Sequence, residues 1–267
     1  MKFRSLPTHP LPARPARLGA PRLGADRGQA VVGRVAWADI APRPPVLLRA
    51  FAAAGAVHLL ALLLDLHWLD LLTKPLLMPL LAAWAAARRA PRALIAALLC
   101  GWAGDVLLQG GATVPFLAGM AAFAAGHVCY LLLFRPWLSR LRFSPPRLLL
   151  TDPAPRIALG YAVAWAALLV ALWPGLDAGL RVPVGAYSLL LAAMACCAGA
   201  LGRVAGAGGA LFLLSDTLIA GDLAGWPQPP AASFWVMLTY IGGQFLLVEG
   251  VLRAQHTLHQ PRGAATS

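Results

Sequence analysis

Charged side chains are scarce in this sequence. Asp, Glu, Lys and Arg make up 12% of its 267 residues, whereas an ordinary soluble domain is about a quarter charged. Hydrophobic residues account for 60%, and the mean hydropathy is +0.71. The composition therefore excludes an ordinary soluble domain and predicts a membrane protein.

Cysteines and the common catalytic motifs are scarce as well. The four cysteines lie inside apolar runs with no CxxC spacing, so we expect neither a disulfide nor a zinc site. The sequence contains no P-loop, no GxSxG, no HExxH and no GxGxxG after a strand. These absences remove the usual signals of nucleotide binding, of a serine hydrolase and of a zinc protease, and we expect no cofactor.

Acidic residues are outnumbered, with 10 Asp and Glu against 22 Lys and Arg. A nucleic-acid partner would need these basic residues on one water-exposed face, but they fall between apolar runs, so we expect no nucleic acid. Residues 1–45 are rich in Pro, Arg, Gly and Ala and contain no signal-peptide core. We expect a disordered basic tail there, and contact with anionic lipid headgroups is the alternative.

Long apolar runs dominate the rest of the chain. A bilayer core of about 30 Å needs about 20 apolar residues per helix. Runs bounded by Arg, Pro or polar clusters predict eight helices, at 46–66, 74–88, 92–109, 114–134, 156–174, 182–201, 205–222 and 233–252. The second is expected to begin at Thr73–Pro75, where the missing N–H of proline costs nothing. The fold class is therefore all-α: a polytopic membrane domain over 46–253, followed by a tail over 254–267.

The basic residues also predict an orientation. If the N-terminus is cytoplasmic, all of the 22 Lys and Arg residues except Lys74 and Arg181 fall on the cytoplasmic side. Cytoplasmic loops carry this excess, so we expect both termini inside and an integral, multi-pass protein of a bacterial cytoplasmic membrane.

A few polar side chains interrupt the predicted spans, where an ionisable group costs several kcal/mol unless it faces a cavity or a partner. At about 1.5 Å per residue, Asp105 lies about 20 Å along its helix from the cytoplasmic end, and Asp216 comes to a similar depth. Tyr240 and Gln244, one helical turn apart, lie at that level too. His127 lies nearer the cytoplasmic half, and a structural hydrogen bond to a neighbouring carbonyl is the alternative to a functional role.

The two aspartates stand out because no Lys or Arg is expected at the core of any span to pair with them. With Lys74 above them and Tyr240 alongside, they are expected to line one pocket open to the outer side. Asp65, Asp222 and Glu249 lie within a turn or two of the interface, where solvated or capping roles are expected. Six glycines indicate close approach of the helices at 92–109, 205–222 and 233–252. They are Gly101, Gly104, Gly206, Gly209, Gly242 and Gly243.

Five stretches resemble a known family. They are TKPLLMP at 73–79, GDVLL at 104–108, FLAGMAAFAAGHVCY at 116–130, GALFLLSDTLIA at 209–220 and TYIGGQ at 239–244. In order and spacing they are similar to the lysoplasmalogenase-like membrane proteins, the YhhN/TMEM86 family. The resemblance covers roughly residues 46–253 and implies an eight-helix hydrolase that cleaves the vinyl ether bond of lysoplasmalogens to a fatty aldehyde and a glycerophospho-alcohol.

The resemblance also implies site residues. The two motif aspartates of the family correspond to Asp105 and Asp216, which are the expected catalytic pair. The expected substrate-binding neighbours are Lys74, His127, Ser215, Tyr240 and Gln244. Three features depart from the family pattern, and none of them changes the two aspartates. They are the N-terminal tail, the basic loop 135–156, and Asp222 at a position where a neutral residue is expected.

Two carboxyl groups suit the hydrolysis of a vinyl ether, which passes through an oxocarbenium-like cation. One carboxyl, kept protonated by apolar surroundings, protonates the β-carbon, and the other stabilises the cation and activates water. We expect Asp216 to be the acid and Asp105 the base, and the reverse assignment stays open.

Two other classes of function are compatible with part of this pattern. In a transporter or channel, acids inside the membrane would bind protons or cations, but no internal repeat is detectable between 46–134 and 156–252. A lipid-binding scaffold would not need two acids in the membrane. No metal is expected, because no pair of candidate ligands has helical i, i+3 or i+4 spacing. The expected partners are a lysophospholipid substrate and membrane lipids, and the oligomeric state stays open.

Overall fold

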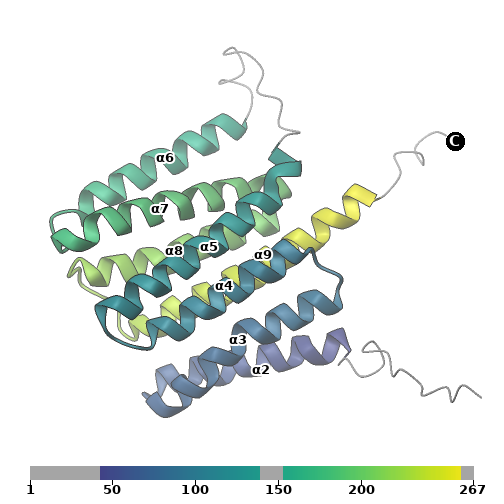
Figure 1. Ribbon diagram of the computed structural model, residues 1–267, viewed down its shortest axis with the longest axis horizontal. Helices are drawn as coiled ribbons and strands as arrows, with labels where there is room; N and C mark the ends of the chain where they lie inside the picture. The colour runs from purple at the N-terminus through teal and green to yellow at the C-terminus, as the bar shows by residue number, and fades with distance from the viewer. Residues whose placement is uncertain (1–42, 139–152, 260–267) are drawn as a thin grey trace, which may run out of the picture. The chain divides into compact units, whose positions relative to one another are not determined.

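The computed structural model describes residues 43–138 and 153–259 of the chain. The expected tail at 1–45 lies outside these residues except for its last three positions, as do most of the basic loop 135–156 and the end of the tail at 254–267. The described residues contain no strand and form eight α-helices, so the expected fold class is confirmed (Figure 1). The helices are α2 (Pro44–Leu63), α3 (His67–Ala87), α4 (Arg92–Leu108), α5 (Thr113–Leu138), α6 (Pro153–Leu172), α7 (Ala178–Ala198), α8 (Arg203–Leu223) and α9 (Ala232–His259).

Most of these helices are long and apolar enough to cross a bilayer. Among the described residues, 7 helices meet that description by length and composition. The exception is α4, whose 17 residues correspond to about 26 Å, at the lower end of what a bilayer core requires. The chain is therefore a polytopic membrane protein, and the sidedness of its termini stays a prediction.

The start of α3 differs from the expectation, since the helix begins at His67 and not at Thr73–Pro75. Pro75 lies inside the helix, where its ring removes one backbone hydrogen bond. Membrane helices tolerate such a proline because neighbouring helices and local adjustments of the backbone satisfy the freed carbonyl, here that of Leu71. The Thr73 hydroxyl donates to a different carbonyl, Leu69 O, at 2.7 Å. Lys74 consequently lies about 10 Å into α3 and not at the turn, which is made by Asp65 with φ +58°.

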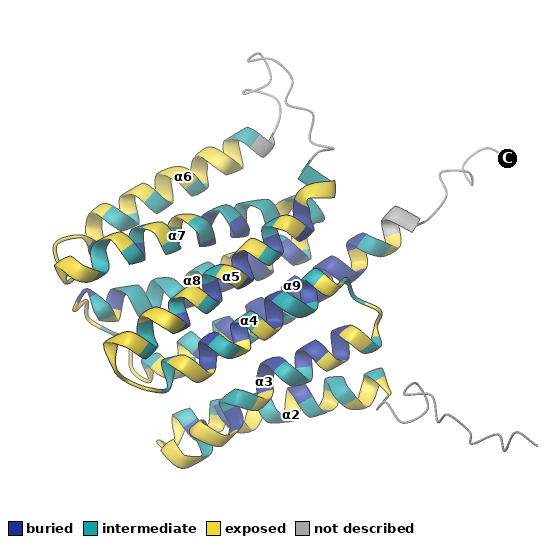
Figure 2. Cartoon of the chain, in the orientation of Figure 1, coloured by how far each residue is buried: buried dark blue, intermediate teal, exposed yellow. Residues whose placement is uncertain are grey.

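Helices that follow one another pack as antiparallel pairs, α2 with α3, α4 with α5, and α8 with α9 (Figure 1). The turns within these pairs, together with the α6–α7 turn, lie at one end of the bundle, which we call the turn end (residues 64–66, 109–112, 173–177 and 224–231). α7 contacts α5, α6 and α8, whereas α6 packs mainly on α7. Figure 2 shows that α6 is exposed along most of its length, so its outer face is available to lipid.

Charge is distributed unequally between the two ends. Among the described residues, Lys74 and Arg181 belong to the half nearer the turn end, and the other basic residues lie toward the opposite end: Arg43, Arg49, Arg88, Arg89, Arg92, Arg135, Arg156, Arg203 and Arg253. At that end Glu249 of α9 pairs with Arg253 Nε at 2.8 Å and approaches Arg88 Nη1 of α3 at 3.9 Å. Glu249 therefore helps to join α3 to α9, beyond the solvated role that was expected.

Glycines allow α8 and α9 to approach closely, as expected. A Cβ added at Gly243 would lie 2.9 Å from Phe212 N, and one at Gly208 would lie 2.6 Å from Leu247 N, so neither position has room for a side chain. The close approach was expected to include α4 as well, but this helix packs mainly on α3 and α5. Gly104 faces the Phe123 ring of α5, and Gly101 is the glycine at which α4 meets α9 side chains.

Candidate active site

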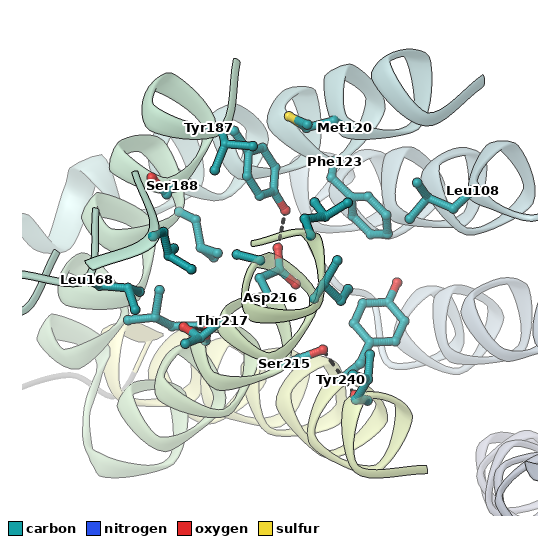
Figure 3. Close-up of a pocket in the computed structure, with 18 of the residues that line it drawn as sticks. Leu108, Met120, Phe123, Leu168, Tyr187, Ser188, Ser215, Asp216, Thr217 and Tyr240 are labelled. Atoms are coloured by element: carbon teal, nitrogen blue, oxygen red, sulfur yellow. Dashed lines mark hydrogen bonds between the residues drawn. The ribbon is translucent and has the colours of Figure 1, made fainter. Parts of the chain in front are cut away.

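A pocket opens among the helices in the half of the bundle nearer the turn end. It encloses about 940 Å³ of empty space, counting the space at its mouth, and most of its wall is apolar. Side chains from α3 to α9 line it, and Figure 3 shows part of the wall. Five of the seven expected site residues are among them: Lys74, Asp105, Ser215, Asp216 and Tyr240. Asp105 and Asp216 therefore line one pocket together with Lys74 and Tyr240, and its opening to the outer side stays a prediction.

Asp105, on α4, is held in a fixed orientation by a hydrogen bond. The residue is 3% exposed, and the Tyr240 hydroxyl donates to Oδ2 of its carboxyl group at 2.8 Å. Gly101, one turn earlier on α4, leaves space for this contact, because a Cβ there would lie 3.2 Å from the Tyr240 hydroxyl oxygen. The ammonium of Lys74 acts electrostatically on the same carboxyl group. Lys74 makes no hydrogen bond or ion pair with another described residue.

Asp216 is partly exposed, and the pocket is where its carboxyl group is accessible. The Tyr187 hydroxyl of α7 donates to its Oδ2 (Figure 3). The neighbouring Ser215 is only 1% exposed, and its hydroxyl donates to Val236 O of α9 at 3.0 Å. Ser215 thus joins α8 to α9 next to the pocket, with its one proton already used.

The other two expected binding residues, His127 and Gln244, lie behind the pocket wall and do not line it. Both are 1% exposed. His127 Nε2 lies 3.2 Å from the Tyr187 hydroxyl, so its partner is a side chain and not the neighbouring carbonyl considered as the alternative. Gln244 Oε1 accepts a hydrogen bond from the Tyr130 hydroxyl at 2.7 Å. Their position indicates support of the wall rather than contact with a ligand.

The sequence did not single out Tyr187, although this residue makes the only side-chain hydrogen bond to Asp216 that the described residues provide. A tyrosine in a membrane helix is common near the interface, so its type alone carried little signal. Depth was the available clue. Tyr187 lies about 14 Å from the start of α7 and Asp216 about 10 Å from the end of α8, both measured from the turn end.

Metal ligands do not gather in this region. Within residues 43–138 and 153–259, no group of three His, Cys, Asp or Glu side chains is placed to hold a metal ion. The polar groups of the pocket are two carboxyls, two phenols, one ammonium, one indole N–H and a few hydroxyls, a set that is suited to proton transfer and to binding an anion.

Comparison with known proteins places the chain in a family. The model of the YhhN family matches residues 69–251, a region that contains every expected site residue. The chain belongs to the YhhN family. No solved structure matches this YhhN protein.

Curated relatives of this YhhN protein carry one name. It is 34% identical over 158 residues to "Lysoplasmalogenase TMEM86B" of Homo sapiens, covering 59% of this chain and 62% of the human one. The protein of the same name from Rattus norvegicus is 34% identical over 191 residues, covering 70% of this chain and 75% of the rat one. The Sus scrofa protein is 38% identical over 151 residues, covering 57% and 59%. The match thus spans less than two thirds of the human and pig relatives.

Proposed function

We propose that this protein is a membrane hydrolase that cleaves the vinyl ether bond of lysoplasmalogens, releasing a fatty aldehyde and a glycerophospho-alcohol. The observation that carries the proposal is a pocket within the bundle into which two carboxyl groups project, each oriented by one tyrosine hydroxyl. The names of the curated relatives support the same reaction.

The pocket has a suitable place for each part of such a substrate. Its apolar wall fits a single hydrocarbon chain, and this side is made by α5, α6 and α8, with Met120, Leu168 and Leu223 among its residues. Lys74 makes no ion pair among the described residues and lines the pocket, so its ammonium is available to bind the phosphate. The vinyl ether, which lies between chain and headgroup, then faces the two aspartates.

The first half of the reaction adds water. Asp216 transfers its proton to the β-carbon of the vinyl ether, which leaves an oxocarbenium-like cation at the carbon bonded to oxygen. The ionised Asp105 stabilises this cation and takes a proton from the water that adds to that carbon. The product is a hemiacetal, with Asp216 now ionised and Asp105 protonated.

The second half exchanges the roles of the two acids. Asp216 takes the proton of the hemiacetal hydroxyl, the bond to the glycerol oxygen breaks, and Asp105 gives its proton to that oxygen. The aldehyde and the alcohol leave, and both carboxyl groups have returned to their starting states. No proton needs to enter from outside the pocket, which suits a pair of acids surrounded by apolar side chains.

The roles of acid and base are assigned from the position of Lys74. Lys74 lines the pocket and acts electrostatically on the carboxyl group of Asp105, which suits Asp105 to the ionised role. Asp105 is therefore the base in the first step and Asp216 the acid.

An aldehyde assay tests the proposal. The purified full chain is given a lysoplasmenyl lipid and the matching lyso-acyl lipid, and we expect aldehyde from the first and none from the second. Asp105→Asn and Asp216→Asn should each lower the rate about 10²- to 10⁴-fold, while Asp222→Asn, an exposed acid on the same helix as Asp216, should not. Full aldehyde release by both folded pocket variants would refute the mechanism. Proton or cation flux into proteoliposomes without aldehyde would favour a transporter.

A further inference from the structure

We infer that Tyr187, oriented by His127, positions Asp216 so that one chosen oxygen of its carboxyl group faces the substrate. The inference rests on the proposed function, since it concerns the acid of that reaction. It assigns a role to a residue of α7 that the sequence did not single out, and it gives His127 a role through Tyr187 instead of through the substrate.

The directions of the hydrogen bonds follow from the number of protons available. A phenol has one proton, and Tyr187 donates it to Asp216 Oδ2. The Tyr187 oxygen can then only accept from His127, so the proton of the neutral imidazole is on Nε2, which lies 3.2 Å away. The opposite nitrogen, Nδ1, must be the one without a proton.

The surroundings of His127 agree with this tautomer. Nδ1 is buried and has no hydrogen-bond partner among the described residues. A buried N–H without a partner costs more than a buried lone pair of this kind, so the proton is better placed on Nε2, where Tyr187 accepts it. The imidazole is kept in place by aromatic neighbours, with ring centroids 5.0 Å from Phe212 and 5.4 Å from Tyr187.

The consequence for Asp216 is a distinction between its two oxygens. Oδ2 is occupied by the Tyr187 hydroxyl, so Oδ1 is the atom left to carry the proton toward the pocket. When Asp216 has given up that proton, the same hydroxyl remains as a donor to the carboxylate. The contact therefore stabilises Asp216 more after proton transfer than before it, which is the condition for lowering a barrier.

Asp105 is held by a separate set of hydrogen bonds, so deleting one hydroxyl removes the donor of one acid and leaves the donor of the other in place. Its donor is Tyr240, and the Gln244 amide that neighbours Tyr240 is in turn bound by Tyr130. No described hydrogen bond joins this set to His127 or Tyr187.

The test uses hydroxyl and imidazole deletions in the full chain. We expect Tyr187→Phe to lower kcat about 10- to 100-fold with little change in KM, the range for a hydrogen bond to a charged group. His127→Leu should lower kcat by a smaller factor, and His127→Gln, whose amide keeps a donor near the Nε2 position, should recover most of it. In the Tyr187→Phe background, His127→Leu should have almost no further effect. Tyr161→Phe on α6, which removes a hydroxyl outside the pocket, is the matched control.

Unchanged kcat in Tyr187→Phe would overturn the inference, as would an equal effect of His127→Leu with and without the Tyr187 hydroxyl. A second measurement does not depend on activity. The infrared carboxyl band that disappears in Asp216→Asn should shift in Tyr187→Phe and not in Tyr161→Phe, and an unshifted band would also overturn the inference. If the wild-type chain released no aldehyde, the proposed function would fail, and the infrared band would still decide whether Tyr187 holds Asp216.

Discussion

Two adjacent glycines on α9 should respond in opposite ways to the same substitution. A Cβ at Gly243 would lie 2.9 Å from Phe212 N and 3.0 Å from Gly208 O, both backbone atoms of α8. A Cβ at Gly242 would lie 3.5 Å from Leu211 Cδ1, an ordinary contact with the end of a flexible side chain. Alanine also favours a helix over glycine by about 1 kcal/mol in both cases.

The magnitude for Gly243→Ala follows from what must move. Relief of the contact requires α8 and α9 to separate by a few tenths of an ångström along their closest line, because backbone atoms cannot rotate away. Overpacking of this kind costs about 1–3 kcal/mol, so the variant should be less stable by up to about 2 kcal/mol after the helix-propensity gain. Gly242→Ala should be neutral or more stable by up to about 1 kcal/mol.

The separation should also reach the active site. Phe212 stacks edge-on against Tyr240, with ring centroids 5.4 Å apart, and Tyr240 holds Asp105. Gly243→Ala should therefore reduce aldehyde release more than Gly242→Ala does at a temperature where both remain folded. Thermal unfolding in detergent and the aldehyde assay measure the two effects. Equal stability of the two variants would refute the close approach of α8 and α9 at Gly243.

Substitutions at three further positions test individual contacts. Lys74→Met should raise KM for the lysolipid about tenfold or more, since a charge-assisted bond to phosphate is worth about 1.5–3 kcal/mol. Lys74→Arg, which keeps the positive charge, should raise KM less, and steady-state kinetics would measure both. Tyr240→Phe should lower kcat about 10- to 100-fold by releasing Asp105 from its 2.8 Å hydrogen bond, and an unchanged kcat would contradict that role. Thr73→Val should destabilise the protein by about 1–3 kcal/mol, because His58 Nδ1, 2.9 Å from the Thr73 hydroxyl, would lose this partner while buried; a denaturation curve that matches the wild type would argue against it.

The helices were largely predictable because membrane insertion leaves few alternatives. A run of apolar residues must be helical to satisfy its backbone in lipid, so composition alone located all eight helices that the structure describes. The error at α3 arose where two rules conflicted. Proline usually marks a helix start, but inside a membrane bundle the neighbouring helices allow α3 to continue past Pro75.

The candidate site was predictable only in part, for a related reason. Asp105, Asp216 and Lys74 are costly in a membrane helix, so their presence is itself a signal, and they do line one pocket. Tyr187 is cheap there, so its residue type carried no signal, and only its depth along α7 could have set it apart from other aromatic residues. Which neutral side chain completes a site depends on how α7 is rotated against α8, and that is set by packing.

The depth of the pocket fits the chemistry proposed for it. Asp216 and Tyr240 lie about 10 and 12 Å from the turn-end limits of α8 and α9. If the turn-end limits of the helices lie at the water-facing edge of the headgroup layer, which is about 5–8 Å thick on each side of a bilayer, both groups lie a few ångströms below the start of the hydrocarbon core. In a lysoplasmalogen the vinyl ether is at the first carbons of the chain, directly beneath the glycerol, and it occupies the same depth when the headgroup stays at the interface. A lysolipid can therefore present its reactive bond to the two aspartates without leaving its ordinary position in the membrane, and Lys74, about 10 Å into α3, lies at the level of Asp216.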